Sequence, residues 1–232
     1  MKLAIMQPYF LPYIGYFQLI AAADQFIVYD NIKYTKKGWI NRNRLLTNGS
    51  DTVFTLPLKK GSDSLNVNER VISTDFDCNK LLNQFIGAYM RAPYFDQTFP
   101  LLGRILNYEE RNLFYYIHHS IVEICIHLGI TTTIRISSQI EIDHNLKGQD
   151  KVIALCNSTG ADSYINSIGG LSLYSRDAFQ ENNIDLKFLQ SKYPSYIQFD
   201  EEFVPWLSII DILMFNPLSD LKACLANSFE LI

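Results

Sequence analysis

Short runs of apolar, β-branched residues alternate along the chain with longer segments in which apolar residues recur at helical spacing. The short runs predict strands near residues 2–6, 25–29, 52–58, 133–137, 163–166 and 186–190. The longer segments predict helices near residues 14–23, 79–90, 99–108, 113–128, 149–158, 172–182, 206–214 and 219–228. Strands that alternate with helices are typical of βαβ units, so we predict an α/β fold with a doubly wound, mostly parallel, Rossmann-like sheet.

Three predicted helices follow one another without an intervening strand. We expect them to form a helical subdomain, around residues 78–130, inserted into a single α/β domain that spans residues 1–232. The segment 113–128 is apolar on nearly all sides, which predicts a mostly buried helix. Its three histidines have no acidic neighbours at metal-ligand spacing, so we interpret them as structural and expect no metal site.

Composition limits the class of protein. The 232 residues include 48% apolar and 19% charged side chains and sum to a net charge of −4, which is ordinary for a globular protein and argues against a dedicated nucleic-acid binder. Four cysteines without a CxxC pair predict a reducing compartment. The N-terminus lacks the pattern of a signal peptide or membrane span, so we expect a cytoplasmic protein without membrane insertion. The oligomeric state stays open.

Charge is distributed unevenly along the chain. Residues 1–60 contain eight Lys and Arg against three Asp, a sum of +5, so the other 172 residues sum to −9. The stretch from residue 31 to residue 50 has five cations and no acid. Such a local basic surface suits a small anionic ligand, such as a phosphate or nucleotide, better than a polymer. A solvated lysine-rich loop is the alternative.

The first strand leads into a loop and helix start that carry candidate chemistry. Two prolines hold the loop, and Gly15 in the first helical turn permits a close approach to the backbone, so this helix start is a candidate seat for phosphate. The shape resembles the first signature of nucleotidyltransferase-type Rossmann folds, but tyrosines replace both of its histidines. The alternative is that these aromatics belong to the core. The candidate binding residues here are Gln7, Tyr9, Tyr13, Gly15 and Tyr16.

The basic segment that follows the second strand is a second candidate. Arg42 and Arg44 alternate, so they would share one side of an extended segment and could bind phosphate or carboxylate, while Trp39 offers a stacking face. Asp30 stands at a strand end, a position suited to a general base. An exposed basic hairpin in which Asp30 pairs with Lys33 is the alternative.

Three later segments supply further candidates. Lys147 and Gln149 precede a helix, where a cation and free N–H groups favour an anion, and His144 nearby is a second candidate base. A strand ends at Asn166 and runs into a Gly169-Gly170 turn, an arrangement that lets backbone approach a ligand. Asp211 lies within an apolar helix, so we expect it to meet a cation or hydrogen-bond donors.

These segments together resemble the WbqC-like protein family, found in bacterial O-antigen and surface-polysaccharide gene clusters. The resemblance rests on residues 6–20, 37–44, 147–149, 160–166 and 207–216, together with the Gly169-Gly170 pair, and it adds Lys37 and Asn41 as binding candidates. It implies a transferase that modifies a nucleotide-linked amino sugar, with N-acylation by an amino acid as one form of the reaction. No cofactor is firmly implied, although ATP or an activated acyl donor fits.

Two other functions stay open. One is nucleotidyl transfer or ATP-dependent adenylation, against which the tyrosines at positions 13 and 16 weigh. The other is a non-catalytic protein that binds a sugar nucleotide. In each case the expected ligand is a small anion such as a nucleotide-sugar, with no nucleic acid.

Overall fold

The computed structural model of the chain describes residues 1–192, 194–199 and 202–232, and a parallel sheet forms its centre. The sheet contains β1 (Lys2–Met6), β2 (Gln25–Val28), β5 (Thr133–Ile136), β6 (Ser163–Ser167), β7 (Asp185–Ser191) and β8 (Phe229–Leu231). These strands lie in the order β5-β2-β1-β6-β7-β8, and only β8 runs antiparallel to its neighbour. Counted within the sheet, this is the 3-2-1-4-5-6 order of doubly wound nucleotide-binding folds, which confirms the predicted fold class.

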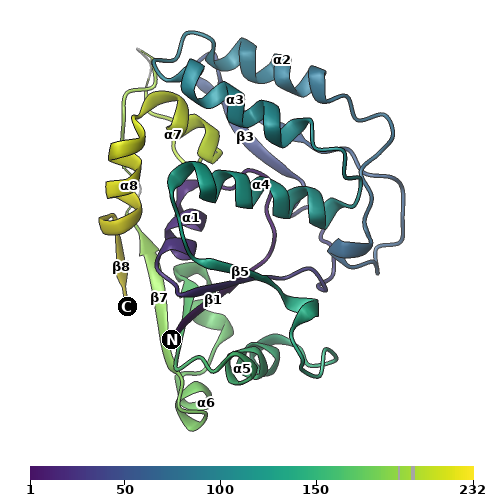
Figure 1. The fold of residues 1–232 in the computed structure, drawn as a ribbon, viewed down its shortest axis with the longest axis vertical. Helices are drawn as coiled ribbons and strands as arrows, with labels where there is room; N and C mark the ends of the chain where they lie inside the picture. The colour runs from purple at the N-terminus through teal and green to yellow at the C-terminus, as the bar shows by residue number, and fades with distance from the viewer. Residues whose placement is uncertain (193, 200–201) are drawn as a thin grey trace.

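Helices cover both faces of this sheet (Figure 1). On one face lie α1 (Ile14–Ala21), α4 (Leu113–Leu128) and α8 (Leu218–Asn227), and on the other lie α5 (Gly148–Thr159) and α6 (Arg176–Glu181). An outer layer of α2 (Cys78–Tyr89), α3 (Phe95–Leu106) and α7 (Ile209–Phe215) packs against the first group. Three short 3-10 helices also occur in the connections: η1 (Val67–Glu69), η2 (Ser137–Gln139) and η3 (Ile168–Leu173).

Side chains of each central strand divide between two hydrophobic cores. In β1, Leu3 and Ile5 belong to the core under α5 and α6, whereas Ala4 between them belongs to the core under α1 and α4. In β2, Ile27 and Phe26 divide in the same way. This alternation is the consequence of the two-residue period of a strand, and it explains why a sheet with two apolar faces needs helices on both sides.

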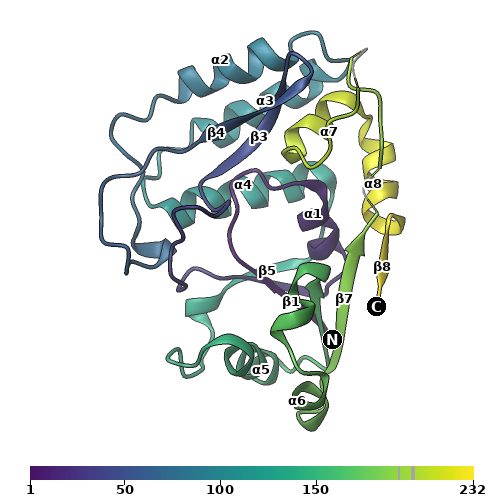
Figure 2. The same cartoon turned by 180° about the vertical axis from the view of Figure 1, so that it is seen from behind.

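A separate β-hairpin corrects the prediction for residues 31–58. The predicted strand at 52–58 does not join the sheet, because β4 (Ser50–Thr55) pairs antiparallel with β3 (Arg42–Thr47). β3 lies in the basic segment that we expected to be extended and for which a hairpin was the alternative. The cause is local: Asn48 and Gly49 adopt φ values of 50° and 73°, the left-handed pair that a two-residue hairpin turn requires. Figure 2 shows the hairpin near α2 and α7, with which β3 makes contact.

Two predicted helix starts also shift. The helix predicted from residue 99 begins at Phe95, because Leu101, Leu102 and Ile105 are completely buried and hold the helix together through Pro100. The helix predicted from residue 172 begins at Arg176, since the preceding residues form η3. The other six predicted helices are confirmed to within a few residues.

The helices predicted as a subdomain share a core with the sheet. Residues of α2, α3 and α4 belong to the same apolar cluster as Phe26 of β2 and Phe17 of α1. None of the described helices is both long enough and apolar enough to cross a membrane.

Histidine burial in α4 predicts a pH-dependent stability. Burial, with a contribution from His119, lowers the pKa of His118, and burial also lowers the pKa of His127. The pKa of a histidine in an unfolded chain is about 6.5. As the pH falls through this value, the unfolded chain binds more protons than the folded chain does, and this difference favours unfolding. We expect the free energy of unfolding to fall between pH 7 and pH 5.5, with a smaller slope in His118→Phe, as measured by urea denaturation. Equal slopes in both proteins would contradict this.

Candidate functional site

The carboxyl ends of β1, β2 and β6 meet at one edge of the sheet. The chain reverses its direction of progress between β1 and β6, since β1 connects to β2 on one side and β6 to β7 on the other. Ligands of doubly wound sheets bind outside the strand ends at such a switch point. Predicted site residues gather here: Gln7 follows β1, Asp30 follows β2, and Asn166 is the penultimate residue of β6. Asn31, which was not predicted, follows Asp30.

Asp30 is buried at this edge with four hydrogen-bond donors around its carboxylate. Oδ1 accepts from the Ser137 hydroxyl at 2.8 Å and the Ser138 N–H at 2.9 Å. Oδ2 accepts from the Ser138 hydroxyl at 2.6 Å and the Asn68 amide at 2.9 Å. Burial raises the pKa of Asp30, but these hydrogen bonds outweigh burial and leave the pKa below its ordinary value. Asp30 therefore holds β2, η1 and η2 together and has no free lone pair for a substrate proton.

Asn31 connects the hydrogen bonds around Asp30 to Lys151 and His144. Its Oδ1 lies 2.8 Å from the Ser137 hydroxyl and accepts from Lys151 Nζ at 3.2 Å. Those contacts orient the amide so that Nδ2 lies 2.9 Å from Nδ1 of His144. Nδ1 is then the acceptor nitrogen of a neutral ring, and Nε2 carries the proton. His144 is thereby oriented as a hydrogen-bond donor through Nε2.

Asn31, His144 and Lys151 line a cavity of about 590 Å³, which we call the lysine cavity. Its walls are Tyr29, Asn31, Ile32, Lys33, Asn66, His144, Asn145, Leu146, Lys147, Gly148, Lys151, Val152 and Tyr174. Three are lysines, and none of these described residues is acidic. The first turn of α5, which begins at Gly148, adds free backbone N–H groups. The cavity is thus suited to an anion with several oxygens.

Lys151 is the most buried cation of the lysine cavity. Its side chain is 6% exposed, lies over the Tyr29 ring at 5.6 Å and donates to Asn31, but forms no ion pair within the described part of the chain. Burial lowers the pKa of Lys151, and the nearby charge of Asp30 opposes that shift. A buried ammonium without a carboxylate contact is a group that an anionic ligand would stabilise.

The sequence analysis missed Lys33, Lys151, Asn31 and Tyr174. One signal was available: Lys147 and Lys151 are four residues apart at the start of a predicted helix, so they lie on one face. Lys33 and Tyr174 gave no comparable signal, because only the sheet order brings the segments after β2 and β6 to the same edge.

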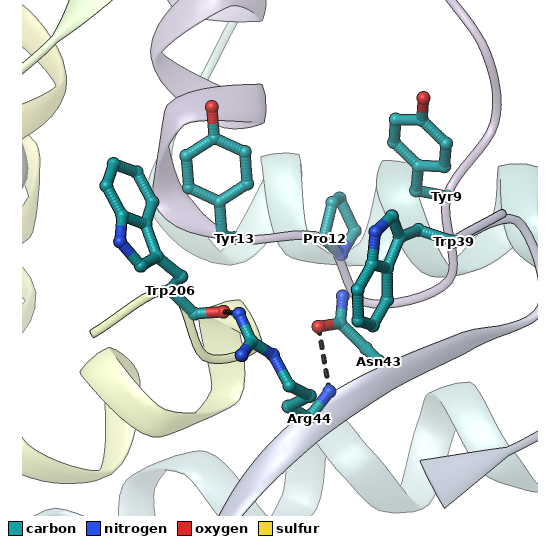
Figure 3. Close-up of a pocket in the computed structure, with 7 residues that line it drawn as sticks. All are labelled: Tyr9, Pro12, Tyr13, Trp39, Asn43, Arg44 and Trp206. Carbon is teal, nitrogen blue, oxygen red and sulfur yellow. Dashed lines mark hydrogen bonds between the residues drawn. The ribbon is translucent and has the colours of Figure 1, made fainter. Parts of the chain in front are cut away.

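A second cavity, of about 300 Å³, lies in the loop after β1, and we call it the aromatic pocket. Tyr9, Pro12, Tyr13, Trp39, Asn43, Arg44 and Trp206 line it, as Figure 3 shows. The two indoles are partly open to solvent, with Trp39 44% and Trp206 49% exposed. Three distant segments thus supply the walls, of which the predictions named Tyr9, Tyr13, Trp39 and Arg44.

Arg42 and Arg44 lie on one side of β3, as their alternation predicted. Both guanidinium groups lie over the Trp39 ring, at 5.5 and 5.4 Å from its centroid. Arg42 donates to the carbonyls of Gly38 and Lys37. Arg44 donates to Asp51 and to the Trp206 carbonyl, each at 3.1 Å, which joins the hairpin to the segment before α7.

Strained backbone occurs in the aromatic pocket, at Trp206, and next to it, at Leu11. Leu11 and Trp206 have φ values of 47° and 61°, in the left-handed region that bulky residues rarely adopt. Neighbouring hydrogen bonds hold both: the Leu11 carbonyl accepts from Asn43 and Ser208 at 2.8 Å each, and the Trp206 carbonyl accepts from Arg44. Such strain costs about 1–3 kcal/mol per residue and clusters at ligand sites in folded proteins.

The start of α1 is covered by the protein itself. A Cβ at Gly15 would lie 2.4 Å from Cε2 of Tyr13, so glycine allows the Tyr13 ring to lie across the first turn. Tyr16 is buried in the core, donates to the Gln7 carbonyl at 3.0 Å, and has its pKa raised by burial. The close approach that we expected of a ligand at Gly15 is made by the Tyr13 ring.

Several other predicted binding residues make contacts within the protein. The Asn41 amide donates to the Leu56 carbonyl at 2.7 Å, and Gln149 Oε1 accepts from the Ser175 N–H at 2.6 Å. Asn166 Oδ1 accepts from the following N–H at 2.7 Å, and its amide lies 2.8 Å from where a Cβ at Gly170 would be. Lys37 and Gln7 are exposed, and the space above Gly169 is open.

Asp211 of α7 is fully buried and meets neutral donors. Tyr89 donates to Oδ1 at 2.9 Å, while Tyr196 and Gln198 donate to Oδ2 at 2.6 and 2.7 Å. Burial raises the pKa of Asp211, and these three hydrogen bonds oppose the shift. Asp211 lines neither cavity, and it ties α2 and the segment around Gln198 to α7. We expected Asp211 to meet a cation or hydrogen-bond donors, and the structure shows three hydrogen-bond donors.

No group of three or more His, Cys, Asp or Glu side chains in the described residues is arranged to hold a metal ion.

Comparison with known proteins identifies relatives. The model of the WbqC-like protein family matches residues 7–223. "Uncharacterized protein Rv1507c" of Mycobacterium tuberculosis is 30% identical over 215 residues, which cover 91% of this chain and 92% of that protein. No solved structure matches the chain.

The donors around Asp30 predict a large effect of a small substitution. In Asp30→Asn, an NH2 group replaces an oxygen that faces donors, so buried donors lose their acceptor. We expect the free energy of unfolding in urea to fall by about 3 kcal/mol. Asp63→Asn is the matched control, because Asp63 is exposed and its ion pair among the described residues is with exposed Lys36, so loss of that pair should change stability little. Equal effects of the two substitutions would argue against the role assigned to Asp30.

Proposed function

This chain belongs to the WbqC-like protein family, and we propose that it binds a nucleotide-linked amino sugar and transfers an acyl group to it during bacterial surface-polysaccharide synthesis. The observation that carries the proposal is the lysine cavity: Lys33, Lys147 and Lys151 surround it without an acid, at the edge where doubly wound sheets bind nucleotides.

The diphosphate of such a sugar matches the lysine cavity in charge and in hydrogen bonding. Its two negative charges would offset part of the charge of three lysines, and its oxygens would accept from the ammonium groups and from the first turn of α5. Lys151 gains most, because it is the most buried of the three lysines and forms no ion pair in the described residues. Charge-assisted hydrogen bonds of this kind are worth about 1.5–3 kcal/mol each.

An acyl transfer fits the groups at this edge when the acyl donor arrives activated, for example as a thioester. The amino nitrogen of the sugar attacks the acyl carbonyl carbon, the C–N bond forms, and the C–S bond breaks. The proton of the amine passes to the leaving thiolate, so no protein base is required. Nε2 of His144 supplies a donor for the oxyanion that forms on the carbonyl.

Non-catalytic binding of a sugar nucleotide is the second candidate function. One observation favours it: the carboxylate of Asp30 and Nδ1 of His144, our two predicted bases, are both engaged in hydrogen bonds within the protein. Nucleotidyl transfer has less support, because the Tyr16 hydroxyl is buried on the Gln7 carbonyl and carries no positive charge.

Calorimetric titration with UDP-N-acetylglucosamine and UDP tests the binding proposal. We expect Lys151→Met to weaken the affinity by about tenfold or more, the equivalent of one charge-assisted hydrogen bond. Lys187→Met is the matched control, because that lysine lies on β7, pairs with Asp185 and lines neither cavity. Absence of binding by the wild-type protein, or equal losses in both variants, would contradict the lysine cavity as the phosphate site.

Turnover separates the two candidate functions. A glucosamine-bearing UDP-sugar incubated with an acyl thioester should yield the N-acylated sugar, and His144→Phe should lower the rate while the affinity for UDP falls by less than the rate. Recovery of the bound sugar nucleotide unchanged with every acyl donor tried would support the non-catalytic function.

A further inference from the structure

The aromatic pocket and the lysine cavity are separate. Tyr9 and Tyr13 of the aromatic pocket pack against the core under α1 and α4. Tyr29 and Tyr174 of the lysine cavity pack against the core under α5 and α6, on the other face of the sheet. No described residue lines both cavities. A ligand of the aromatic pocket therefore meets a different set of groups from an anion in the lysine cavity.

The chemistry of the aromatic pocket limits its ligand. Four aromatic rings offer apolar faces with negative π density, and no acidic side chain is among the residues that line it. Arg44 presents donors, whereas the Asn43 amide is already engaged with the carbonyls of Phe10 and Leu11. Tyrosine hydroxyls and indole N–H groups add further donors. A ligand fits this pocket when the ligand has C–H groups on the face of its ring and acceptor oxygens at the edge of its ring.

The angles between the walls favour a puckered ring over a flat base. The rings of Tyr13 and Trp206 meet at 68° with their centroids 5.7 Å apart, so they form a corner rather than a parallel slot. A sugar ring is thicker than a base and carries C–H groups on its face with hydroxyls at its edge, which is the shape and chemistry of this corner.

The pocket is held in shape before any ligand arrives. Leu11 and Trp206 keep their left-handed backbone because Asn43, Ser208 and Arg44 donate to their carbonyls. The N–H of Ile209 also donates to the Pro12 carbonyl at 2.9 Å. Walls fixed in this way reduce the entropy lost when a ligand binds.

We propose that the aromatic pocket is a second ligand site, independent of the lysine cavity, and that it binds a sugar ring in the pyranose form. This second site goes beyond the proposed function, because binding of a sugar ring in the aromatic pocket does not require a nucleotide. The site gives the protein a place for a second sugar, and none of the described residues that line it lines the lysine cavity.

The sequence provides a direct reporter for this site. Trp39 and Trp206 are the two tryptophans of the chain, and both line the aromatic pocket. A proton–nitrogen correlation spectrum therefore contains two indole signals, which Trp39→Phe and Trp206→Phe assign. We expect both signals to move saturably when the wild-type protein is titrated with methyl β-glucopyranoside or with methyl β-glucuronide. A larger affinity for the glucuronide would indicate that Arg44 binds a carboxylate.

Controls distinguish this site from the lysine cavity. Trp39→Ala should weaken the affinity for the glycoside about fivefold or more, through loss of one aromatic wall. Tyr115→Ala, which removes an exposed ring of α4 outside both cavities, should leave the affinity unchanged. Lys151→Met should also leave the glycoside titration unchanged, even where it abolishes binding of UDP.

Two results would overturn the proposal. Indole signals that stay fixed up to high millimolar concentrations of both glycosides would exclude a sugar site in the wild-type protein. Signals that move with uridine and not with either glycoside would assign the pocket to a base. Neither result depends on the stability of a variant, and neither bears on binding of phosphate in the lysine cavity.

Discussion

The buried carboxylate of Asp30 is the interaction on which the candidate site depends. A charge at that depth is tolerated only with donors around it, and the donors come from η2 after β5 and from η1 beyond the hairpin. Because Ser137 serves both Asp30 and Asn31, the same arrangement orients the Asn31 amide. Asn31 in turn places Lys151 and His144 at the lysine cavity. One buried carboxylate thus organises Lys151 and His144 through Asn31.

The distribution of charge along the sequence differs from the distribution of charge in the folded structure. The sequence analysis located the positive region in residues 1–60, yet of the three lysines in the lysine cavity only Lys33 comes from that region. Lys147 and Lys151 come from the acidic remainder and reach the cavity because α5 begins at the carboxyl edge of the sheet. Arg42 and Arg44 from the basic region lie instead over Trp39 and hold backbone carbonyls. The lysines of the cavity thus come from both parts of the chain, whereas the two arginines of the hairpin make aromatic and backbone contacts within the protein.

Sequence patterns predicted the sheet and most helices because alternating apolar runs and helical periods report burial directly. A basic hairpin was only the alternative prediction although Asn48-Gly49 is a turn signal, because cations rather than apolar residues dominate the β3 sequence. Candidate residues next to strand ends, such as Asp30, were placed at the site, but the donors that occupy its lone pairs come from distant segments. Trp206 could not be assigned from sequence, because long-range hydrogen bonds from Arg44, Ser208 and Ile209 bring its segment to the pocket.

The most direct test of the central claim is a crystal structure of the protein soaked with UDP-N-acetylglucosamine. The account predicts that the diphosphate lies between Lys33, Lys147 and Lys151, with Asp30 still bound to its four donors. A diphosphate located in the aromatic pocket against Arg44, or at the start of α1, with the lysine cavity unaltered, would contradict it.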